Sequence, residues 1–509
     1  MSASKFKRER QNLYQADPLK KEPEKVRQER KKKKLRRILI ICAAVLLIAA
    51  VAAVLLSSGI FITHSTAATV GGHKLSPALF GCFYHDAYYK FYNENSGFIS
   101  QILDTSKPLD EQVYSKEDGT TWADYFVQEA AKSAAETYAI YNEAVAAKYQ
   151  LTAEDEKYLS DLKDDVHTYA NYMKYKSDAE FLSKNYGKGC TMDVYMEYSR
   201  ISRMATSYAA AKKASYSYTE KQMDDAYNAD PNSYNSVSYK IYYVSETTGK
   251  YDKDGKAIAD MQKSEAEAKK MAEDSCGNID EFNRQALELA PEKKKAIYSD
   301  PDYTLRSNYM ISRASEPLRG WLTEAGRKYG DTTYVQADAR AYYVCFYLGC
   351  SDNNYPLVNM RQIFVQPVAD STNKDDPQGT KKVKTDAQAI LDTFESGAKT
   401  EDAFAALAKE KSDDTSTSEN GGLYTNYYPG QLNEAVTTWC FDKSRKQGDC
   451  TSVEGSDGVH ILYYVGQGIN YRRYLEDKNL RDADYKKWHD GVCTLKTRTH
   501  WFGLLYMSR

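Results

Sequence analysis

An unbroken run of 19 apolar residues, Ile38 to Leu56, constrains this chain more than any other sequence feature. A helix needs about 20 such residues to cross the hydrocarbon core of a membrane. The 37 residues before the run carry 15 Lys and Arg against 5 Asp and Glu, a net charge of +10, whereas residues 57–73 contain no Lys or Arg. Because positive flanks stay in the cytoplasm, the sequence predicts a basic cytoplasmic tail at 1–37, a transmembrane helix at 38–60 and an extracytoplasmic remainder.

A cleaved signal peptide is the alternative, with Ser65, Thr66 and Ala67 as the small residues of a cleavage site. Signal peptides have a short charged region and an apolar core of roughly 7–15 residues. Both segments are longer here, which favours a retained single-pass anchor in the cell membrane. Cys42 lies inside the run without the Leu-Ala-Gly triplet of a lipoprotein, so we interpret it as a membrane-embedded thiol.

The chain after residue 37 is acidic, and its cysteines form no motif. It holds 54 basic and 66 acidic residues, a net charge of −12, which argues against nucleic-acid binding because that needs a basic face. No two cysteines are spaced as C-x-x-C, so neither a zinc knuckle nor a thioredoxin motif is predicted. An exported location permits disulfides; Cys440 with Cys450 is one candidate pair, and buried free thiols are the equal alternative. No His, Asp and Glu spacing matches a metal site, and we expect no metal or cofactor.

Six short motifs follow one another between Met360 and Leu462. They are MRQIFV at 360–365, DAFAALAK at 402–409, SDD at 412–414, GG at 421–422, PGQL at 429–432 and GVHIL at 458–462. Their order and spacing resemble the parvulin family of prolyl isomerases, also called PpiC or rotamase domains. The resemblance implies a parvulin-like domain at 353–468. One motif departs from the family, because parvulins usually carry a His in the first strand, where this chain has Gln362.

The resemblance also implies a catalytic set and an apolar pocket for the proline ring. His460 is the central His that parvulins keep, Asp414 lies at their acidic or thiol-bearing position, and Gln362 replaces the other His. The residues implied to bind substrate are Tyr424, Leu432, Val436 and Phe441. Gln362 cannot titrate as His does, but it still donates and accepts hydrogen bonds, so we expect it to orient His460 or a water.

These residues also have purely structural interpretations. A His in an apolar strand is often a core residue with satisfied hydrogen bonds. Asp414 would cap the turn that begins at Ser412, and Gly421-Gly422 would be only a flexible loop.

The region 61–235 is predicted to be helical. Apolar residues at helical spacing extend from Trp122 to Tyr149, and Thr152 with Asp155 approximates a capping box. Thr191 and Thr219 precede two further helices, which end before the break at 230–233. With the GGHKLS element at 71–76, this layout resembles the N-terminal chaperone module of SurA- and PrsA-type foldases.

Residues 236–350 resemble the parvulin layout in degraded form. A strand at 237–244 is followed by helices at 264–273 and 279–289 and by a strand at 340–348. Ile241 stands where the first parvulin His would be, Tyr343 about where the second would be, and the double-Gly loop is missing. We therefore predict a degenerate parvulin-like domain that serves as a spacer or a peptide-binding surface.

The C-terminal residues 469–509 are predicted to pack on the helical module. Residues 482–495 have the pattern of a helix with Tyr485, Trp488 and Val492 on one face, and the aromatic-rich residues 497–507 have that of a strand. Such a short helix gains most of its stability from packing, and in SurA-type foldases the C-terminal segment returns to the N-terminal module. Packing on the second parvulin-like domain, or a loose tail, is the alternative.

These features together predict an α+β protein: an N-terminal membrane helix, a helical chaperone module and two tandem parvulin-like domains. The implied function is an extracytoplasmic foldase with prolyl isomerase activity, weakened or lost through Gln362, that acts on unfolded or proline-containing exported polypeptides. The alternative is a non-catalytic holdase, or a partner subunit of a surface or secretion assembly. The 44 tyrosines, against 15 Phe, either suit a peptide-binding surface or reflect a compositional habit.

Overall fold

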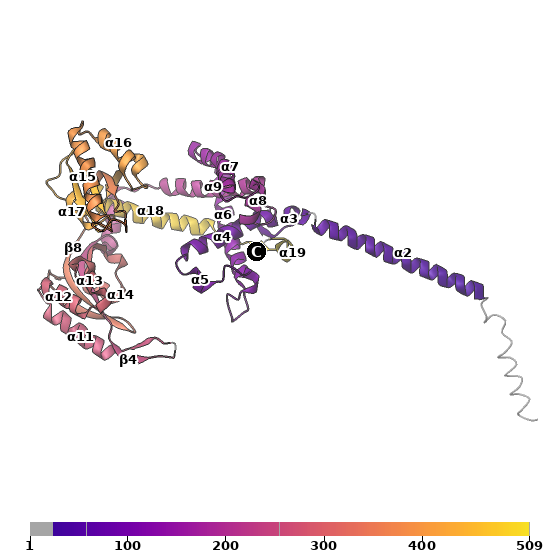
Figure 1. Cartoon of the computed structure of the whole chain (residues 1–509), viewed down its shortest axis with the longest axis horizontal. Coiled ribbons are helices and arrows are strands. Elements are labelled where there is room, and N and C mark those ends of the chain that lie inside the picture. Colours follow the sequence, from indigo (N-terminus) through magenta and orange to yellow (C-terminus); the bar gives the residue numbers. More distant parts are fainter. Residues whose placement is uncertain (1–23, 58, 254, 508–509) are drawn as a thin grey trace, which may run out of the picture. The chain divides into compact units, whose positions relative to one another are not determined.

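The computed structural model describes residues 24–57, 59–253 and 255–507 of the chain (Figure 1). These residues divide into two compact units. Unit 1 comprises Met1–Ser215 with Tyr485–Arg509, and unit 2 comprises Tyr216–Asp484. Helices make up most of unit 1, whereas unit 2 carries two four-stranded sheets with helices packed on them, so the α+β class is confirmed.

The apolar run lies in α2 (Glu24–Ser57), a helix of 34 residues, which is followed by α3 (Ile60–His64). Within the part of the chain that the structure describes, none of the helices combines the length and the apolar character that a membrane crossing requires. The predicted transmembrane helix at 38–60 is therefore not confirmed, and residues 1–23 of the predicted basic tail lie outside the described residues.

Four polar residues start the long helices of unit 1. Ser76, Thr121, Thr152 and Thr191 each accept a hydrogen bond from a backbone N–H of the first turn, and Thr121 and Thr152 form complete capping boxes. The helices of unit 1 that follow α3 are α4 (Pro77–Glu94), α5 (Ile99–Ile102), α6 (Trp122–Ala146), α7 (Ala153–Tyr172), α8 (Asp178–Asn185) and α9 (Met192–Ala214). A helix therefore follows Thr191, as the sequence predicted.

The chain's C-terminal segment is part of unit 1. Tyr485, Trp488 and Val492 of α18 (Tyr471–Val492) pack against Ile140 of α6 and Ala205 of α9. The Trp488 indole Nε1 also donates to the Glu143 carboxylate at 2.8 Å. A three-stranded sheet closes the unit, in the order β13 (Arg498–Thr499), β1 (Ala68–Val70), β2 (His73–Leu75). Figure 1 shows these yellow residues among the indigo and magenta helices.

Two expectations for the C-terminal segment need correction. The helix expected at 482–495 begins earlier, at Tyr471, because Tyr471 and Leu475 are buried in unit 2 and support the first turns. The strand expected at 497–507 is wrong beyond two residues. After β13 the chain turns into α19 (Trp501–Leu504), where Gly503 lies against the backbone of Thr66 in space that admits no side chain.

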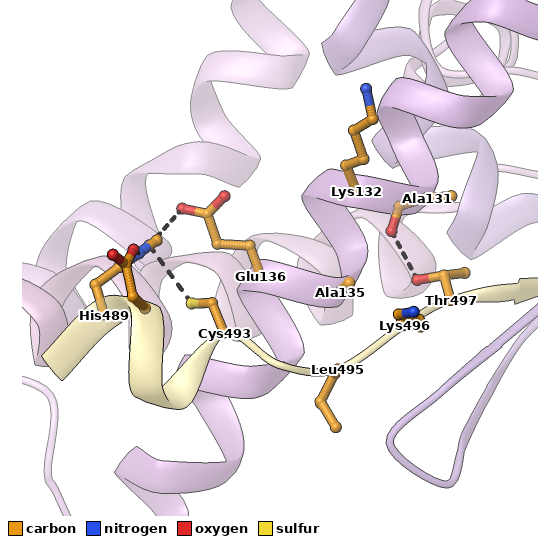
Figure 2. A pocket seen from close by; sticks show the side chains of 10 residues that line it. Ala131, Lys132, Ala135, Glu136, His489, Cys493, Leu495, Lys496 and Thr497 are labelled. Carbon is orange, nitrogen blue, oxygen red and sulfur yellow. Dashed lines mark hydrogen bonds and ion pairs between the residues drawn. The ribbon is translucent and has the colours of Figure 1, made fainter. Parts of the chain in front are cut away.

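A cavity of about 600 Å³ lies where the C-terminal segment meets α6 (Figure 2). His489 Nε2 is 3.0 Å from the Glu136 carboxylate and 3.4 Å from Cys493 Sγ, and the Thr497 hydroxyl donates to the Ala131 carbonyl at 2.7 Å. These contacts attach the segment to α6. Among the described residues, neither this cluster nor any other group of His, Cys, Asp and Glu side chains is arranged to hold a metal ion.

The two sheets of unit 2 share one topology. The first has the order β6 (Leu305–Met310), β3 (Ser236–Val244), β8 (Ala341–Ser351), β7 (Thr332–Asp338), and the second has the order β10 (Leu423–Tyr427), β9 (Pro356–Val365), β12 (Val459–Asn470), β11 (Cys450–Glu454). In each sheet, the strand that comes first in the sequence (β3 or β9) lies at the centre and pairs antiparallel with the longest strand (β8 or β12). The short hairpin β4 (Thr247–Tyr251) and β5 (Ala257–Ala259) stands apart from them.

Each sheet has helices on both faces. Around the first sheet lie α11 (Met261–Asp274), α12 (Ile279–Leu289), α13 (Lys295–Tyr298) and α14 (Glu316–Leu322), and around the second lie α15 (Thr380–Ser396), α16 (Glu401–Lys411) and α17 (Glu434–Cys440). The chain enters unit 2 through α10 (Glu220–Ala229), which Thr219 caps as predicted. The helix α15 was not predicted from the sequence.

Side-chain alternation separates the two faces of the second sheet. Ile363 and Ile461 pack with α15 and α16, while Met360 and Leu462 pack with α17. The candidate disulfide between Cys440 and Cys450 is wrong, because these residues belong to clusters on opposite faces and all nine cysteines are free.

We predict that Trp488→Ala destabilises the helices of unit 1. The substitution removes the ring packed between α6 and α9 and the hydrogen bond to Glu143, and we expect a loss of about 2 kcal/mol, below the value for a fully buried Trp. Hydrogen exchange at the α9 amides measures this loss. Trp501→Ala is the matched control, because its side chain is 75% exposed; equal effects of the two variants would contradict the prediction.

Candidate active site

The central strand pair of the second sheet brings Gln362 and His460 together. Gln362 lies opposite Leu462 in the ladder and His460 lies opposite Phe364, so both side chains leave the sheet on the α17 face. Both are buried, with 2% and 1% of their surface exposed. Buried polar side chains need hydrogen-bond partners, and these two are each other's partners: His460 Nδ1 and Gln362 Oε1 are 2.9 Å apart.

A chain of hydrogen bonds extends from this pair in both directions. Asn433 caps α17 by accepting from the Val436 N–H at 3.0 Å, which turns its amide Nδ2 toward His460 Nε2 at 2.7 Å. The Asn433 amide therefore donates to His460, and the His460 Nδ1–H donates to Gln362. At the other end, Gln362 Nε2 donates to Asp414 Oδ2 at 3.4 Å. A proton on Nδ1 and a lone pair on Nε2 satisfy both ring contacts.

Asp414 is the acceptor at which several donors converge. Its Oδ2 accepts from the hydroxyls of Tyr424 at 2.8 Å and Thr417 at 2.6 Å, while Ser416 donates twice to Oδ1. Burial acts to raise the pKa of the Asp414 carboxyl, but these donors outweigh it and hold the pKa below its ordinary value. Burial and the bond to Asp414 raise the pKa of Tyr424 to about 12, so its hydroxyl keeps the proton that it donates.

Asn433 and Asp457 belong to the site although the sequence did not point to them. Asp457 Oδ1 lies 3.0 Å from Asn433 Nδ2 and 3.1 Å from His460 Nε2. Burial opposes ionisation of Asp457, yet the adjacent His460 ring and the bond from Asn433 lower its pKa below the ordinary value. The available signal was an Asn directly before a helix, which is a preferred N-cap. Nothing local marked Asp457 as a neighbour of His460.

The double glycine has a steric reason in this site. Gly421 and Gly422 have φ angles of 66° and 71°, and the Gly422 carbonyl accepts from the Gln362 N–H at 2.8 Å. A Cβ on Gly422 would lie 2.1 Å from the Gln362 carbonyl oxygen. The Gly421-Gly422 pair is therefore required for close approach to β9.

The four residues predicted to bind the proline ring share one apolar cluster. Val436 is fully buried, whereas Tyr424, Leu432 and Phe441 are half-buried. Val436 therefore supports the cluster from inside, and the other three have surface that a ligand can reach. The structure thus brings all seven predicted site residues to the same face of the second sheet.

Within residues 236–253 and 255–351, the first sheet has no equivalent polar chain. Ile241 lies opposite Cys345, and Tyr343 lies opposite Tyr243, which is the register that Gln362 and His460 have in the second sheet. The expected positions Ile241 and Tyr343 therefore match in space, and they carry an apolar and an aromatic side chain.

Comparison with known proteins identifies the second sheet and its helices. Residues 367–465 match the family model described as PPIC-type PPIASE domain. This segment is a parvulin-type domain. Foldase protein PrsA 1 of Listeria innocua is 31% identical over 104 residues, which are 20% of this chain and 35% of that protein. The PrsA 1 protein of Listeria monocytogenes is 29% identical over the same share of both chains.

The chain spans about a third of the length of these curated relatives. The crystal structure of PrsA from Bacillus subtilis is 14% identical, over 75% of this chain and 92% of that one, with a TM-score of 0.26. Because this TM-score is too low to support an argument, the assignment of the parvulin-type domain rests on the family model and on the Listeria proteins.

We predict that acid destabilises the parvulin-type domain through Asp414 and Asp457. A carboxyl whose pKa falls on folding contributes its full stability above its ordinary pKa near 4 and loses it as the pH falls toward the lower, folded pKa. The free energy of unfolding should therefore fall on acidification from pH 6 to pH 2. The double variant Asp414→Asn, Asp457→Asn should show a smaller fall in urea titrations; an unchanged fall would contradict this assignment.

Proposed function

We propose that this protein is a membrane-anchored extracytoplasmic foldase whose 353–468 domain catalyses peptidyl-prolyl cis–trans isomerisation. The observation that carries this proposal is the hydrogen-bonded chain from Asn433 to Asp414, which lies beside the half-buried Leu432 and Tyr424 in a segment of the parvulin family. The Listeria relatives of this segment are named foldases.

Isomerisation requires no covalent step. The barrier of about 18–20 kcal/mol arises from the partial double bond of the imide, and an enzyme lowers it by binding the twisted imide more tightly than the planar one. Leu432 and Phe441 offer apolar surface for the proline ring. Tyr424 and Asp414 are half-buried, so they are the polar groups within reach of the imide.

His460 and Gln362 act in this proposal as positioning residues. Their exposed fractions of 1% and 2% leave no surface for a substrate. All the donors in the chain point toward Asp414, and this alignment fixes the carboxylate and the Tyr424 hydroxyl in place. Gln362 suits the position because its amide accepts from His460 and donates to Asp414, as a neutral imidazole would.

The other parts of the chain would serve client binding. In this proposal residues 236–350 are a degenerate parvulin-like domain, and the helices of 61–235 together with the C-terminal residues 469–509 form a chaperone module. The shared strand order of the two sheets supports the first assignment, and the contacts of Trp488 with α6 support the second. Clients would be unfolded or proline-containing exported polypeptides.

A non-catalytic holdase is the second candidate function, and two observations favour it. Ile241 and Tyr343 stand in the first sheet where the second has Gln362 and His460, and Gln362 itself replaces a His of the family. A holdase, or a partner subunit of a surface or secretion assembly, would use both domains for peptide binding alone.

Prolyl isomerase activity separates the two functions. We expect the isolated 353–468 domain to accelerate a proline-limited refolding reaction. His460→Ala and Asp414→Ala should each lower kcat/KM at least tenfold, since that factor needs only about 1.4 kcal/mol of transition-state stabilisation, which one hydrogen bond supplies. Gln362→His, which restores the imidazole pair, should raise kcat/KM.

Asp392→Ala is the matched control, because Asp392 lies on the exposed face of α15 and should leave kcat/KM unchanged. Near-UV circular dichroism verifies that each variant is folded. If the wild type and His460→Ala are equally inactive while folded, isomerase activity is excluded and the holdase function stands.

The anchoring is proposed from the apolar run and its charged flank. Apolar side chains of α2 such as Leu46 and Leu47 are 70% and 67% exposed, so this structure alone does not shield them from water. Protease added to intact cells should therefore remove the domains that follow residue 63 and spare residues 1–37. Recovery of a secreted form that starts near Ala68 would instead show cleavage and exclude the anchor.

A further inference from the structure

Two neighbouring cavities in unit 2 share lining residues and form one groove, which has Phe441 in common with the candidate active site. Their volumes are about 540 and 490 Å³, and Asn308 and Pro429 line both. We call this the Tyr471 groove and define it by Asn308, Tyr355, Tyr428, Pro429, Phe441 and Tyr471. The described residues that line it include neither His460 nor Asp414, and Phe441 is the one residue of the predicted proline pocket among them.

Aromatic rings form one wall of the groove. The Tyr428 and Tyr471 rings are stacked with centroids 5.6 Å apart and planes 9° apart, and Tyr474 continues the stack at 6.4 Å. On the adjoining side, Phe441 meets the Tyr355 ring edge-on at 5.7 Å. Rigid aromatic faces bind apolar and proline side chains at a low cost in conformational entropy.

Tyr355 supplies an unused hydrogen-bond donor. Its hydroxyl is buried and has no hydrogen-bond partner among the described residues. Burial, with a smaller effect of Tyr471, raises the pKa of Tyr355, so the hydroxyl keeps its proton. A buried donor without a partner destabilises a fold, and a ligand carbonyl in the groove would relieve that cost.

The charge at the groove is opposite to that of the surrounding chain. Four basic residues and one acidic residue line the two cavities, namely Arg313, Lys443, Arg445, Lys478 and Asp442. Arg445 pairs with Asp442 and Lys478 with Asp482, whereas Arg313 and Lys443 are exposed and make no ion pair within the described residues. The chain after residue 37 has a net charge of −12, so this local excess favours an acidic ligand.

The walls of the groove are held in place by buried Asn353. Its side chain accepts from the Ser236 hydroxyl at 2.9 Å and donates to the Tyr234 carbonyl at 2.7 Å, while its own carbonyl accepts from the Arg472 N–H at 2.9 Å. Asn308, which lines both cavities, has a left-handed φ of 48°. Such conformations cost free energy and are frequent where a binding surface is shaped.

We propose that the Tyr471 groove is a second polypeptide-binding site, which takes an extended segment carrying carboxylates beside aromatic or proline side chains. The stacked tyrosines and Phe441 contact the apolar side chains, the Tyr355 hydroxyl donates to a backbone carbonyl, and Arg313 with Lys443 attracts the carboxylates. This site does not depend on isomerase activity, because neither His460 nor Asp414 makes any of its contacts and it shares only Phe441 with the other site.

Binding of a fluorescein-labelled peptide of four Glu-Pro-Phe repeats to the full chain tests this site by fluorescence anisotropy. Tyr355→Phe should raise Kd about fivefold, the value of one hydrogen bond, without lowering the melting temperature. The double variant Arg313→Glu, Lys443→Glu should raise Kd about tenfold at low salt and less at high salt. A peptide with Gln in place of Glu should bind more weakly to the wild type.

Variants of the exposed strand β4 are the matched controls. Tyr251→Phe and Lys250→Glu make the same chemical changes outside the groove and should leave Kd within twofold of the wild type. His460→Ala should also bind normally. The proposal is overturned if the groove variants keep the wild-type affinity, or if Lys250→Glu loses as much affinity as they do. It is also overturned if His460→Ala loses affinity, because the peptide would then bind in the active site.

Discussion

The antiparallel pairing of β9 with β12 is the interaction on which the candidate active site depends. Because side chains alternate along each strand, one register sends Ile363 and Ile461 to the helices α15 and α16 and sends Gln362 and His460 to the opposite face. A slip of one residue would exchange the two faces. The large apolar core under α15 and α16 therefore fixes the register, and the register places the two polar side chains together.

The buried polar groups on that face then form one directed chain. Asn433 is oriented by its capping bond to α17, His460 by Asn433, and Gln362 by His460, and the chain ends at Asp414. Because these side chains are buried, leaving any of their polar atoms without a partner would lower the stability of the fold. The same network explains why an amide substitutes for an imidazole at position 362, since both present one donor and one acceptor.

Contacts between segments far apart in the sequence also complete unit 1. Trp488 and its neighbours complete the packing between α6 and α9, and β13 adds a strand beside β1. Residues more than 340 positions apart in the sequence thus share one hydrophobic core and several hydrogen bonds, among them those of Trp488 with Glu143 and of Thr497 with Ala131. The helices α6 and α9 are therefore fully packed only when the C-terminal segment is in place.

The sequence by itself determined the features that depend on local physics. Thr121, Thr152, Thr191 and Thr219 begin helices because a side-chain oxygen satisfies a free N–H of the first turn, and the spaced motifs at 360–465 were sufficient to indicate the parvulin-type domain. Only the tertiary structure decided the two further partners of His460, because Asn433 and Asp457 reach it from separate parts of the chain. It also decided that Trp501–Leu504 is helical, since Gly503 must approach the backbone of Thr66. Contacts between distant segments leave no local pattern, so their residues cannot be paired by reading along the chain.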